Sequence, residues 1–356
     1  MFNDIYRGKR VLVTGHSGFK GSWLTMWLGR LGAELCGVSL PPETEPNHFR
    51  LLNPPGRSEW CDIRDAEKLG SVLREFRPEI IFHLAAQPLV RLSYRKPVDT
   101  LAVNVGGTVN LLEAARNVPE LRAVVVVTSD KCYRNSEKAE GYRENDPLGG
   151  YDPYSASKGC QELVAASYRD SFLRAAGVGL ATARAGNVIG GGDWAADRLV
   201  PDLVRAAAAG AVEPLRSPSA VRPWQHVLEP LGGYLLLGQR LLEGDAAAAS
   251  AWNFGPETAD ALTVGEVAAL MNRFWPRVGF RFAPPADAPH ETKLLRLDCT
   301  KAARDLGWRG VWNAEECIRR TAGWYRGYYD SGRINTAADL EAYVADAARK
   351  GLSWTN

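Results

Sequence analysis

A tyrosine and a lysine four residues apart, Tyr154 and Lys158, have side chains whose combined chemistry is easy to state. On a helix, positions four apart share one face, so the two side chains would project together. A free tyrosine has a pKa of about 10 and is a poor base near neutral pH. A nearby ammonium group stabilises the phenolate and lowers that pKa, so the pair could take a proton from a hydroxyl group. Taken alone the motif is weak, because this spacing often arises by chance.

Three glycines spaced three apart, Gly15, Gly18 and Gly21, follow a short apolar run at 11–14 and precede an apolar helical pattern. This predicts a strand, a tight turn and a helix. The turn would bring the backbone close to a diphosphate, and the helix N-terminus would direct N–H groups at it. We therefore predict a dinucleotide site, the alternative being a turn without a ligand. The positive charge of a bound nicotinamide would also stabilise the Tyr154 phenolate while hydride leaves the deprotonated alcohol carbon.

A hydroxyl, a carboxylate and an ammonium stand side by side at Ser129, Asp130 and Lys131, directly after a run at 121–128 that is nearly all valine. Such a run predicts a strand buried on both faces, as in the centre of a parallel sheet. Ligands of open α/β sheets lie outside the carboxyl ends of the strands. Most such clusters are solvated turns. The central strand and the Tyr154 helix, which starts at the same edge, favour a site.

Strands that alternate with helices predict an α/β fold with a doubly wound parallel sheet. We expect residues 1–186 with 227–258 to form the dinucleotide-binding domain, and 187–226 with 259–356 to form a smaller C-terminal substrate-binding lobe. Strands are expected at 11–14, 33–40, 59–65, 79–84, 121–128, 178–184 and 251–254, and the main helices at 98–117, 152–176, 197–209 and 227–242.

Composition excludes several classes of function. The 356 residues carry a net charge of only +2, which argues against a dedicated nucleic-acid surface. The six cysteines form no CxxC pair and show no metal-like spacing, so we expect free thiols, a reducing compartment and no metal. No stretch is long and apolar enough to span a membrane, and the N-terminus has no apolar signal core. We therefore expect a soluble cytoplasmic protein.

Motifs along nearly the whole chain resemble those of the extended short-chain dehydrogenase/reductases and, more narrowly, of the CDP-glucose 4,6-dehydratases. They include TGHSGFKGSWL, TSDKCY, YSASK, GGGDW and RPWQHVLEP. The resemblance implies an NAD-dependent lyase that oxidises CDP-D-glucose at C4, eliminates water across C5 and C6, and returns hydride to C6, giving CDP-4-keto-6-deoxy-D-glucose for polysaccharide biosynthesis. The related dTDP-glucose dehydratases have Thr-Asp-Glu where this chain has Ser129, Asp130 and Lys131, which leaves the C5 base open.

The resemblance also implies roles for individual residues. Tyr154, assisted by Lys158, would take the proton of the 4-hydroxyl, Ser129 would bind the 4-oxygen, Asp130 would protonate the C6 oxygen, and Lys131 is the candidate C5 base. A homodimer would form through the long helices that begin near Val98 and Asp152. The cofactor-binding residues would be Gly15, His16, Ser17, Gly18, Phe19, Lys20, Gly21, Asp62, Ile63, Leu84, Ala85, Ala86, Asn104, Tyr154 and Lys158. The substrate-binding residues would be Gln87, Asn187, Arg198, Arg222 and His226.

Alternatives remain at this point. A nucleotide-sugar epimerase or reductase of the same fold would not need an acid at C6, and a non-catalytic dinucleotide sensor would not need the Tyr154–Lys158 pair. His16 could instead be a solvated turn residue, and His83 is expected to be a packed core histidine. The second strand ends in Val38-Ser39-Leu40, with neither an acid nor an arginine. That feature does not distinguish NAD from NADP, so NAD follows from the resemblance alone.

Overall fold

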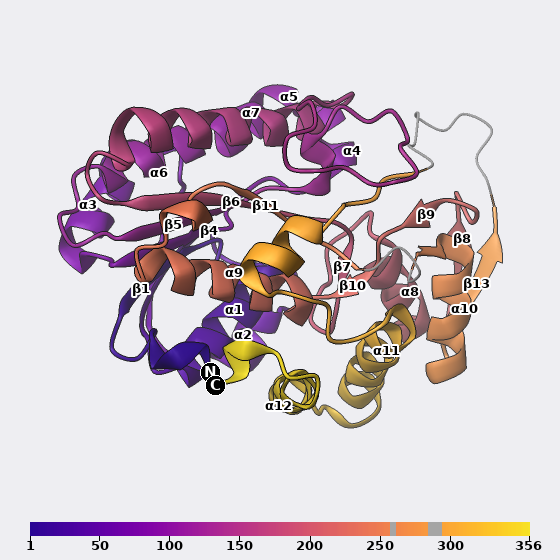
Figure 1. Ribbon diagram of the computed structural model, residues 1–356. Helices are drawn as coiled ribbons and strands as arrows, with labels where there is room; N and C mark the ends of the chain where they lie inside the picture. Colours follow the sequence, from indigo (N-terminus) through magenta and orange to yellow (C-terminus); the bar gives the residue numbers. More distant parts are fainter. Residues whose placement is uncertain (257–260, 284–293) are drawn as a thin grey trace.

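A seven-stranded parallel sheet lies at the centre of the molecule (Figure 1), in the order β11-β6-β5-β4-β1-β2-β3. The computed structural model describes residues 1–256, 261–283 and 294–356. Each neighbouring pair of strands is parallel, which confirms the predicted α/β fold. The strands are β1 (Arg10–Thr14), β2 (Glu34–Ser39), β3 (Arg57–Trp60), β4 (Ile80–His83), β5 (Ala123–Val127), β6 (Gly179–Ala185) and β11 (Ala251–Phe254).

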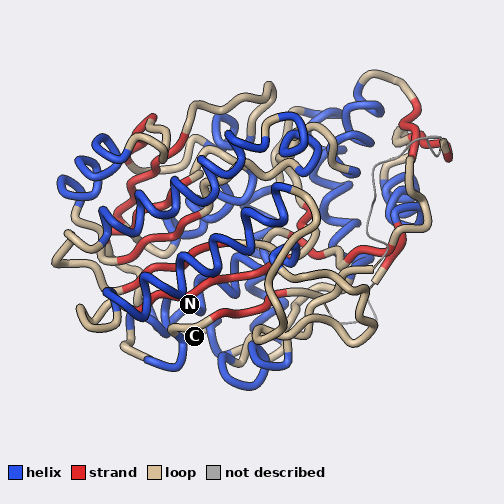
Figure 2. Tube along the Cα trace, turned by 90° about the horizontal axis from the view of Figure 1, so that it is seen from above, coloured by secondary structure: helices blue, strands red, loops and turns tan. Residues whose placement is uncertain are grey.

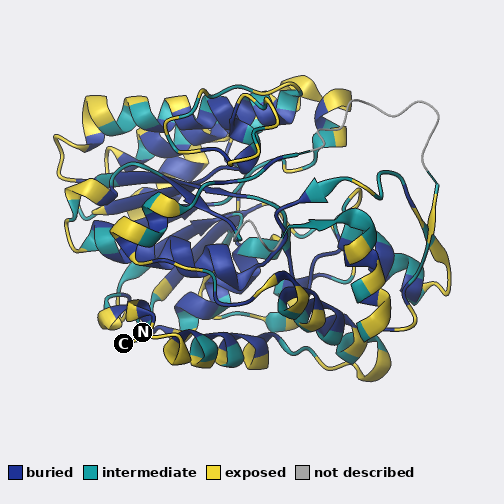
Figure 3. Ribbon diagram, turned by 45° about the vertical axis from the view of Figure 1, so that its right-hand side comes forward, coloured by how far each residue is buried: buried dark blue, intermediate teal, exposed yellow. Residues whose placement is uncertain are grey.

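Helices cover both faces of this sheet (Figures 1 and 2). Successive strand residues point to opposite faces, so Leu12 and Val13 of β1 enter two different cores. The central sheet strands are buried, whereas the edge strand β3 is partly exposed, and the outer sides of the helices are exposed (Figure 3). The helices on one face are α3 (Ala66–Phe76), α5 (Pro97–Leu101), α6 (Gly107–Ala115) and α7 (Pro153–Tyr168), and those on the other include α1 (Phe19–Arg30) and α9 (Leu228–Leu242).

The remaining elements gather mainly beyond the carboxyl ends of the central strands (Figure 1). Three small two-stranded sheets pair β7 with β10, β9 with β12, and β8 with β13. Among the described residues, no helix combines the length and the apolar character needed to cross a membrane. The elements outside the two helical layers of the sheet are α2 (His48–Leu52), α4 (Val90–Arg95), β7 (Val188–Ile189), α8 (Leu199–Ala208), β8 (Val212–Leu215), β9 (Val221–Arg222), β10 (Gln225–His226), β12 (Leu262–Thr263), α10 (Val264–Phe274), β13 (Gly279–Phe282), α11 (Ala314–Ser331) and α12 (Thr336–Arg349).

The strand order reverses between β1 and β4, which are neighbours in the sheet. From β1 the chain adds β2 and β3 on one side of the sheet, and from β4 it adds β5 and β6 on the other. The segments that follow β1 and β4 therefore separate and leave a crevice at the carboxyl ends of these two strands. The glycine turn follows β1 and Leu84 follows β4, so both predicted cofactor segments start at this crevice.

The two long predicted helices are present, but each contains a wider, π-helical segment. Ala102–Gly106 separates α5 from α6, and Arg169–Leu173 follows α7. Helix α8 also begins two residues later than predicted, because Asp197 has a positive φ of 61° and Arg198 is the N-cap. A π turn adds one residue while the buried face is kept on either side, so it shifts the apolar spacing by only one residue. The helices predicted from the sequence do not include that small shift.

Candidate active site

A cavity of about 760 Å³ opens at the carboxyl edge of the sheet, between the glycine turn, the end of β5 and the segment around α8. It gathers predicted residues that are far apart in the sequence. The predicted site residues that line it are Gly15, Ser17, Gly18, Phe19, Lys20, Gly21, Asp62, Ile63, Leu84, Ala85, Ala86, Ser129, Asp130, Lys131, Tyr154, Lys158, Asn187, Arg198 and Arg222.

Two glycines of the turn, Gly15 and Gly21, are packed too tightly against neighbouring backbone to carry a side chain. Gly15 has a φ of +73°, and a Cβ there would lie 2.8 Å from the backbone nitrogen of Ala85. A Cβ on Gly21 would lie 2.0 Å from the carbonyl oxygen of Gly15. Helix α1 begins at Phe19 with Gly18 as its N-cap, and no side chain caps it. Its first N–H groups are therefore placed to bind an anion, so the turn fits a dinucleotide diphosphate.

The end of β2 forms another part of the cavity wall, at residues 39–44. The Ser17 hydroxyl makes hydrogen bonds to the Ser39 hydroxyl and, at 2.9 Å, to the Leu40 carbonyl, which ties the glycine turn to this strand end. Residues 39–44 contain no lysine or arginine. A ribose 2′-phosphate would therefore find no cation on this segment, whereas a free 2′-hydroxyl needs none.

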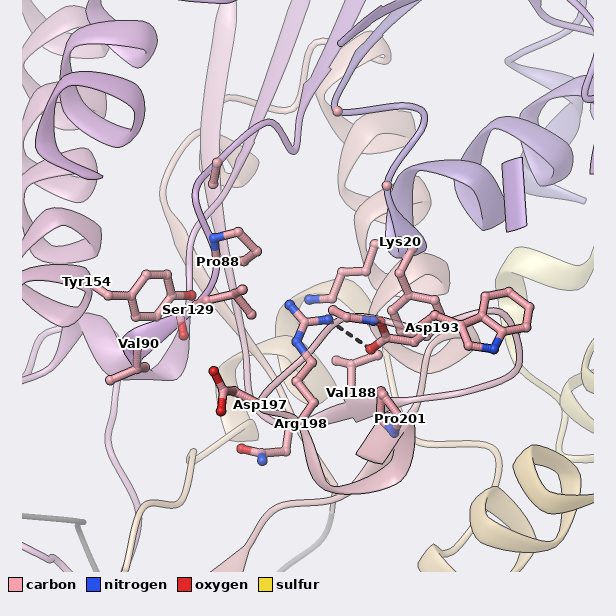
Figure 4. A pocket seen from close by; sticks show the side chains of 18 of the residues that line it. Lys20, Pro88, Val90, Ser129, Tyr154, Val188, Asp193, Asp197, Arg198 and Pro201 are labelled. Carbon is pink, nitrogen blue, oxygen red and sulfur yellow. Dashed lines mark hydrogen bonds and ion pairs between the residues drawn. The ribbon is translucent and has the colours of Figure 1, made fainter. Parts of the chain in front are cut away.

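Ser129, Asp130 and Lys131 line the cavity together with Tyr154, and Figure 4 shows Ser129 beside Tyr154. The Ser129 hydroxyl donates to Oδ1 of Asp130 over 2.9 Å, while Asp130 Oδ2 is buried without a hydrogen-bond partner among the described residues. Burial raises the pKa of Asp130, although Lys131 opposes the shift. Burial likewise raises the pKa of Tyr154 to about 12, against a hydrogen bond with Ser129 that lowers it. The Asp130 carboxyl is thus suited to donate a proton, and Tyr154 needs added positive charge to act as a base.

Lys158 lies one turn after Tyr154 on α7, with its Nζ 5.9 Å from the centre of the tyrosine ring. Its Nζ also donates to the Val127 carbonyl over 3.4 Å. Burial, and then the charge of Lys20, lower the pKa of Lys158 to about 7. Lys131, in contrast, is half-buried at the cavity wall.

A buried ion pair behind this edge was not predicted from the sequence. Glu162, one turn beyond Lys158 on α7, receives hydrogen bonds from Thr128, from Thr182 at 2.7 Å and from Arg184 at 2.7 Å. Both charged side chains are only 3% exposed. The pair therefore joins α7, which carries Tyr154, to the ends of β5 and β6. The sequence offered one hint of this pair: Glu162 lies four residues after Lys158, which places both side chains on the same face of the helix.

Arg198 also has a partner that the sequence analysis did not single out. Its Nη1 donates to Oδ2 of Asp193 over 2.9 Å (Figure 4), and Asp193 follows the glycine run 190–192. Asp193 accepts a second bond at Oδ1 from the Ala195 backbone, over 3.0 Å. The carboxylate thus fixes the loop and the arginine together.

His16 lies outside the cavity lining, contrary to its predicted role. Its ring stacks on Trp60 with centroids 5.5 Å apart and meets Phe49 edge-on, while Nε2 contacts the Ser58 hydroxyl at 3.0 Å. The ring is 1% exposed, so the alternative of a solvated turn residue is also wrong. Burial lowers the pKa of His16 to about 4, so the ring is a neutral packing group near pH 7.

Gln87 and His226 do not line the cavity either, although both were predicted to contact substrate. The Gln87 side chain turns back, accepting from the Leu89 backbone N–H over 2.6 Å. His226 is fully buried, with its ring against Trp23 and Trp312, and burial lowers its pKa to about 3. Sequence position places these residues near the cavity but does not determine where their side chains point.

Two further residues support the cavity from behind. Asn104 is fully buried and lies outside the lining, where its Nδ2 donates to the Ser157 hydroxyl over 2.8 Å and its Oδ1 accepts from the Gln87 N–H over 2.7 Å. His83 is a buried core histidine bonded to the hydroxyls of Thr14 and Thr108, as predicted.

Comparison with known proteins decides the family. The model of the GDP-mannose 4,6 dehydratase family matches residues 12–321. The chain belongs to this family. Within it, the chain is 50% identical over 332 residues to a CDP-glucose 4,6-dehydratase of Salmonella typhimurium, covering 91% of this chain and 92% of that protein. It is 26% identical to a probable dTDP-glucose 4,6-dehydratase of Sinorhizobium fredii, covering 89% and 92%.

Solved structures agree with this family assignment. The dTDP-glucose 4,6-dehydratase DesIV of Streptomyces venezuelae, with NAD and TYD bound, has a TM-score of 0.77 at 26% identity, covering 91% of this chain and 99% of that one. A UDP-glucose 4-epimerase of Thermus thermophilus in complex with NAD also has a TM-score of 0.77, at 27% identity, with coverage of 89% and 99%. The fold is thus shared by dehydratases and epimerases, so the fold alone does not distinguish the two activities.

Proposed function

We propose that the protein catalyses the NAD-dependent dehydration of CDP-D-glucose to CDP-4-keto-6-deoxy-D-glucose. The observation that carries this proposal is that Tyr154 and the Ser129–Asp130–Lys131 trio line one cavity together with the glycine turn. The high identity to a CDP-glucose 4,6-dehydratase supports the choice of substrate. The NAD bound in similar solved structures supports NAD as the cofactor. When bound, NAD accepts a hydride from C4 and later donates it to C6.

The side chains of the cavity divide the chemistry between them. Tyr154, with its phenolate stabilised by Lys158 and the nicotinamide charge, takes the proton of the 4-hydroxyl, and Ser129 binds the 4-oxygen. The 4-ketone makes the C5 hydrogen acidic. Lys131, in its neutral form, removes it, while Asp130 gives a proton to the C6 oxygen so that water leaves. When the hydride returns to C6, C5 takes back a proton from Lys131. The raised pKa of Asp130 favours the protonated form that this step requires.

A panel of nucleotide sugars tests the proposal. The purified protein is incubated with CDP-, dTDP-, GDP- and UDP-glucose, and the 4-keto product is followed by its absorbance in alkali. We expect product from CDP-glucose. A 4-epimer without a keto sugar would support an epimerase instead, and absence of any product despite bound NAD would support a dinucleotide sensor.

Replacing Asp130 by asparagine should separate oxidation from elimination. The amide cannot protonate the C6 oxygen, so turnover is expected to fall about 100-fold or more. Oxidation at C4 does not need Asp130, so reduced cofactor should accumulate and be visible by its absorbance. In the control Asp202→Asn, a carboxylate of the same cavity is removed outside the trio, and no reduced cofactor should accumulate. Equal accumulation in both variants would contradict the role of Asp130.

Replacing Lys131 by alanine tests the C5 base. Exchange of the C5 hydrogen with deuterated solvent should slow by about 100-fold or more, because a positioned base contributes that much to proton transfer. The exchange is measured by mass spectrometry of the recovered sugar. If the variant exchanges the hydrogen at the rate of the parent protein, another group is the base.

We also propose a homodimer formed through α5 and α7. These helices contact each other and present exposed apolar side chains, with Val98 78% and Leu163 61% exposed. Leu101 at the end of α5 is also exposed. Sedimentation should give the mass of a dimer for the parent chain and of a monomer for Val98→Glu. A parent chain that sediments as a monomer would refute the proposal.

Two expectations from the sequence stay predictions. One is the division into a dinucleotide-binding domain (1–186 with 227–258) and a substrate lobe (187–226 with 259–356), whose boundary at 258 lies outside the described residues. The other is the cytoplasmic location.

A further inference from the structure

Lys20 stands in the first turn of α1, directly before the last glycine of the turn. Its backbone belongs to the segment that fits the cofactor diphosphate, but its side chain extends away from that segment. Figure 4 shows the ammonium end of Lys20 directed toward the guanidinium end of Arg198, in the part of the cavity that also contains Ser129 and Tyr154.

Within the described residues, the ammonium group of Lys20 makes few contacts. Its contacts are a long hydrogen bond of 3.5 Å to the Tyr234 hydroxyl and a position 5.9 Å from the centre of that ring. No carboxylate in the described part of the chain forms an ion pair with it. Burial, and next the repulsion of Arg198, lower the pKa of Lys20 to about 8, while Asp130 raises it only in part.

The neighbouring Arg198 has more N–H donors than its ion pair with Asp193 uses. One of its nitrogens, Nη1, is bonded to Asp193, and a guanidinium carries five N–H donors. Arg198 and Lys20 therefore direct two like charges into one space, an arrangement that is unfavourable unless an anion lies between them. Arg222 lines the same cavity. A diphosphate has the charge and the several acceptor oxygens that such a pair of cations can bind.

We propose that the Lys20 side chain, together with Arg198, binds the diphosphate of the nucleotide sugar, while the backbone of the same turn binds the cofactor. The inference rests on the proposed function. One residue of the glycine turn thus serves both ligands, and it joins the position of the substrate to that of the cofactor.

The test compares the two ligands in Lys20→Met, which keeps the length of the side chain and removes its charge. Binding of CDP to the NAD-containing protein is measured by calorimetry, and the NAD content is measured after denaturation. We expect the Kd for CDP to rise about tenfold or more, as for loss of a charged hydrogen bond, with the NAD content unchanged. Loss of NAD with unchanged CDP binding would overturn the inference, and so would unchanged binding of both ligands.

Two further variants keep the test decisive if Lys20→Met folds poorly. Lys20→Arg retains the positive charge and should keep most of the CDP affinity. Tyr234→Phe removes only the hydroxyl that contacts Lys20 and should bind CDP as the parent does. A tenfold loss in either variant would contradict the inference. UDP serves as a second probe, because a diphosphate contact is lost equally for both nucleotides. A parent protein that prefers UDP would refute the proposed substrate but leave the test of Lys20 intact.

Discussion

Replacement of Tyr154 by phenylalanine is expected to lower the turnover of CDP-glucose by about 10²- to 10⁴-fold, the usual contribution of a positioned acid or base. The phenol is the group placed to take the proton of the 4-hydroxyl, and a phenyl ring fills the same space without that capacity. Burial holds the pKa of Tyr154 at about 12 in the free protein. The charges of Lys158 and of a bound nicotinamide would lower this pKa beyond what the Ser129 hydrogen bond does. The hydroxyl should therefore matter at the first step of the reaction.

The measurement is a single turnover with NAD-loaded protein, in which no reduced cofactor should appear. This distinguishes Tyr154→Phe from Asp130→Asn, for which reduced cofactor should accumulate. The variant should still fold, because the Tyr154 backbone N–H retains its 3.1 Å bond to the Ser93 hydroxyl and the helix remains capped by Asp152. Formation of reduced cofactor at the parent rate would show that another group takes the proton.

Removal of one partner from the buried Glu162–Arg184 pair is expected to have the largest effect on stability. Arg184→Met leaves the Glu162 carboxylate buried without its counter-ion, and such a change costs about 3–5 kcal/mol of the free energy of unfolding. The double variant Glu162→Leu with Arg184→Met should lose less than the single variant, because no unpaired charge stays inside. Unfolding in urea, followed by circular dichroism, gives the comparison.

An exposed ion pair of the same chain provides the control. Arg30 and Glu341 form a 2.8 Å pair with side chains 38% and 67% exposed. Arg30→Met should cost about 1 kcal/mol or less, since exposed pairs are screened by water. If Arg184→Met costs no more than Arg30→Met, the buried pair does not hold the catalytic edge together.

The fold was largely predictable because the strands carry strong local signals. The valine run of β5 and the strand–glycine–helix pattern of β1 and α1 each specify one structure, and alternation of strands and helices then leaves few topologies. The π-helical segments were not predicted, since each shifts the apolar spacing by only one residue and otherwise changes local hydrogen bonding.

The site was predictable where chemistry depends on the position of a residue rather than on the direction of its side chain. Ser129, Asp130 and Tyr154 all start from the carboxyl edge of the sheet, and the structure brings them to one cavity. His16 and His226 also belong to segments that carry predicted site residues. Their rings nevertheless pack against aromatic side chains in the core and do not reach the cavity. The Glu162–Arg184 pair joins two segments through contacts that no local pattern encodes.

The π-helical turn at Ala102–Gly106 makes the helical segment between α5 and α6 intolerant of a change in its number of residues. Removing one residue there to give a regular helix would rotate everything beyond it by about 100°. Leu111 and Leu112 would then turn from the core toward water, or else Asn104 would turn from its bonds to Gln87 and Ser157. Substitutions along α6 can be tolerated one at a time, whereas a single-codon deletion between residues 102 and 106 would have to break either the core or the brace behind the cavity.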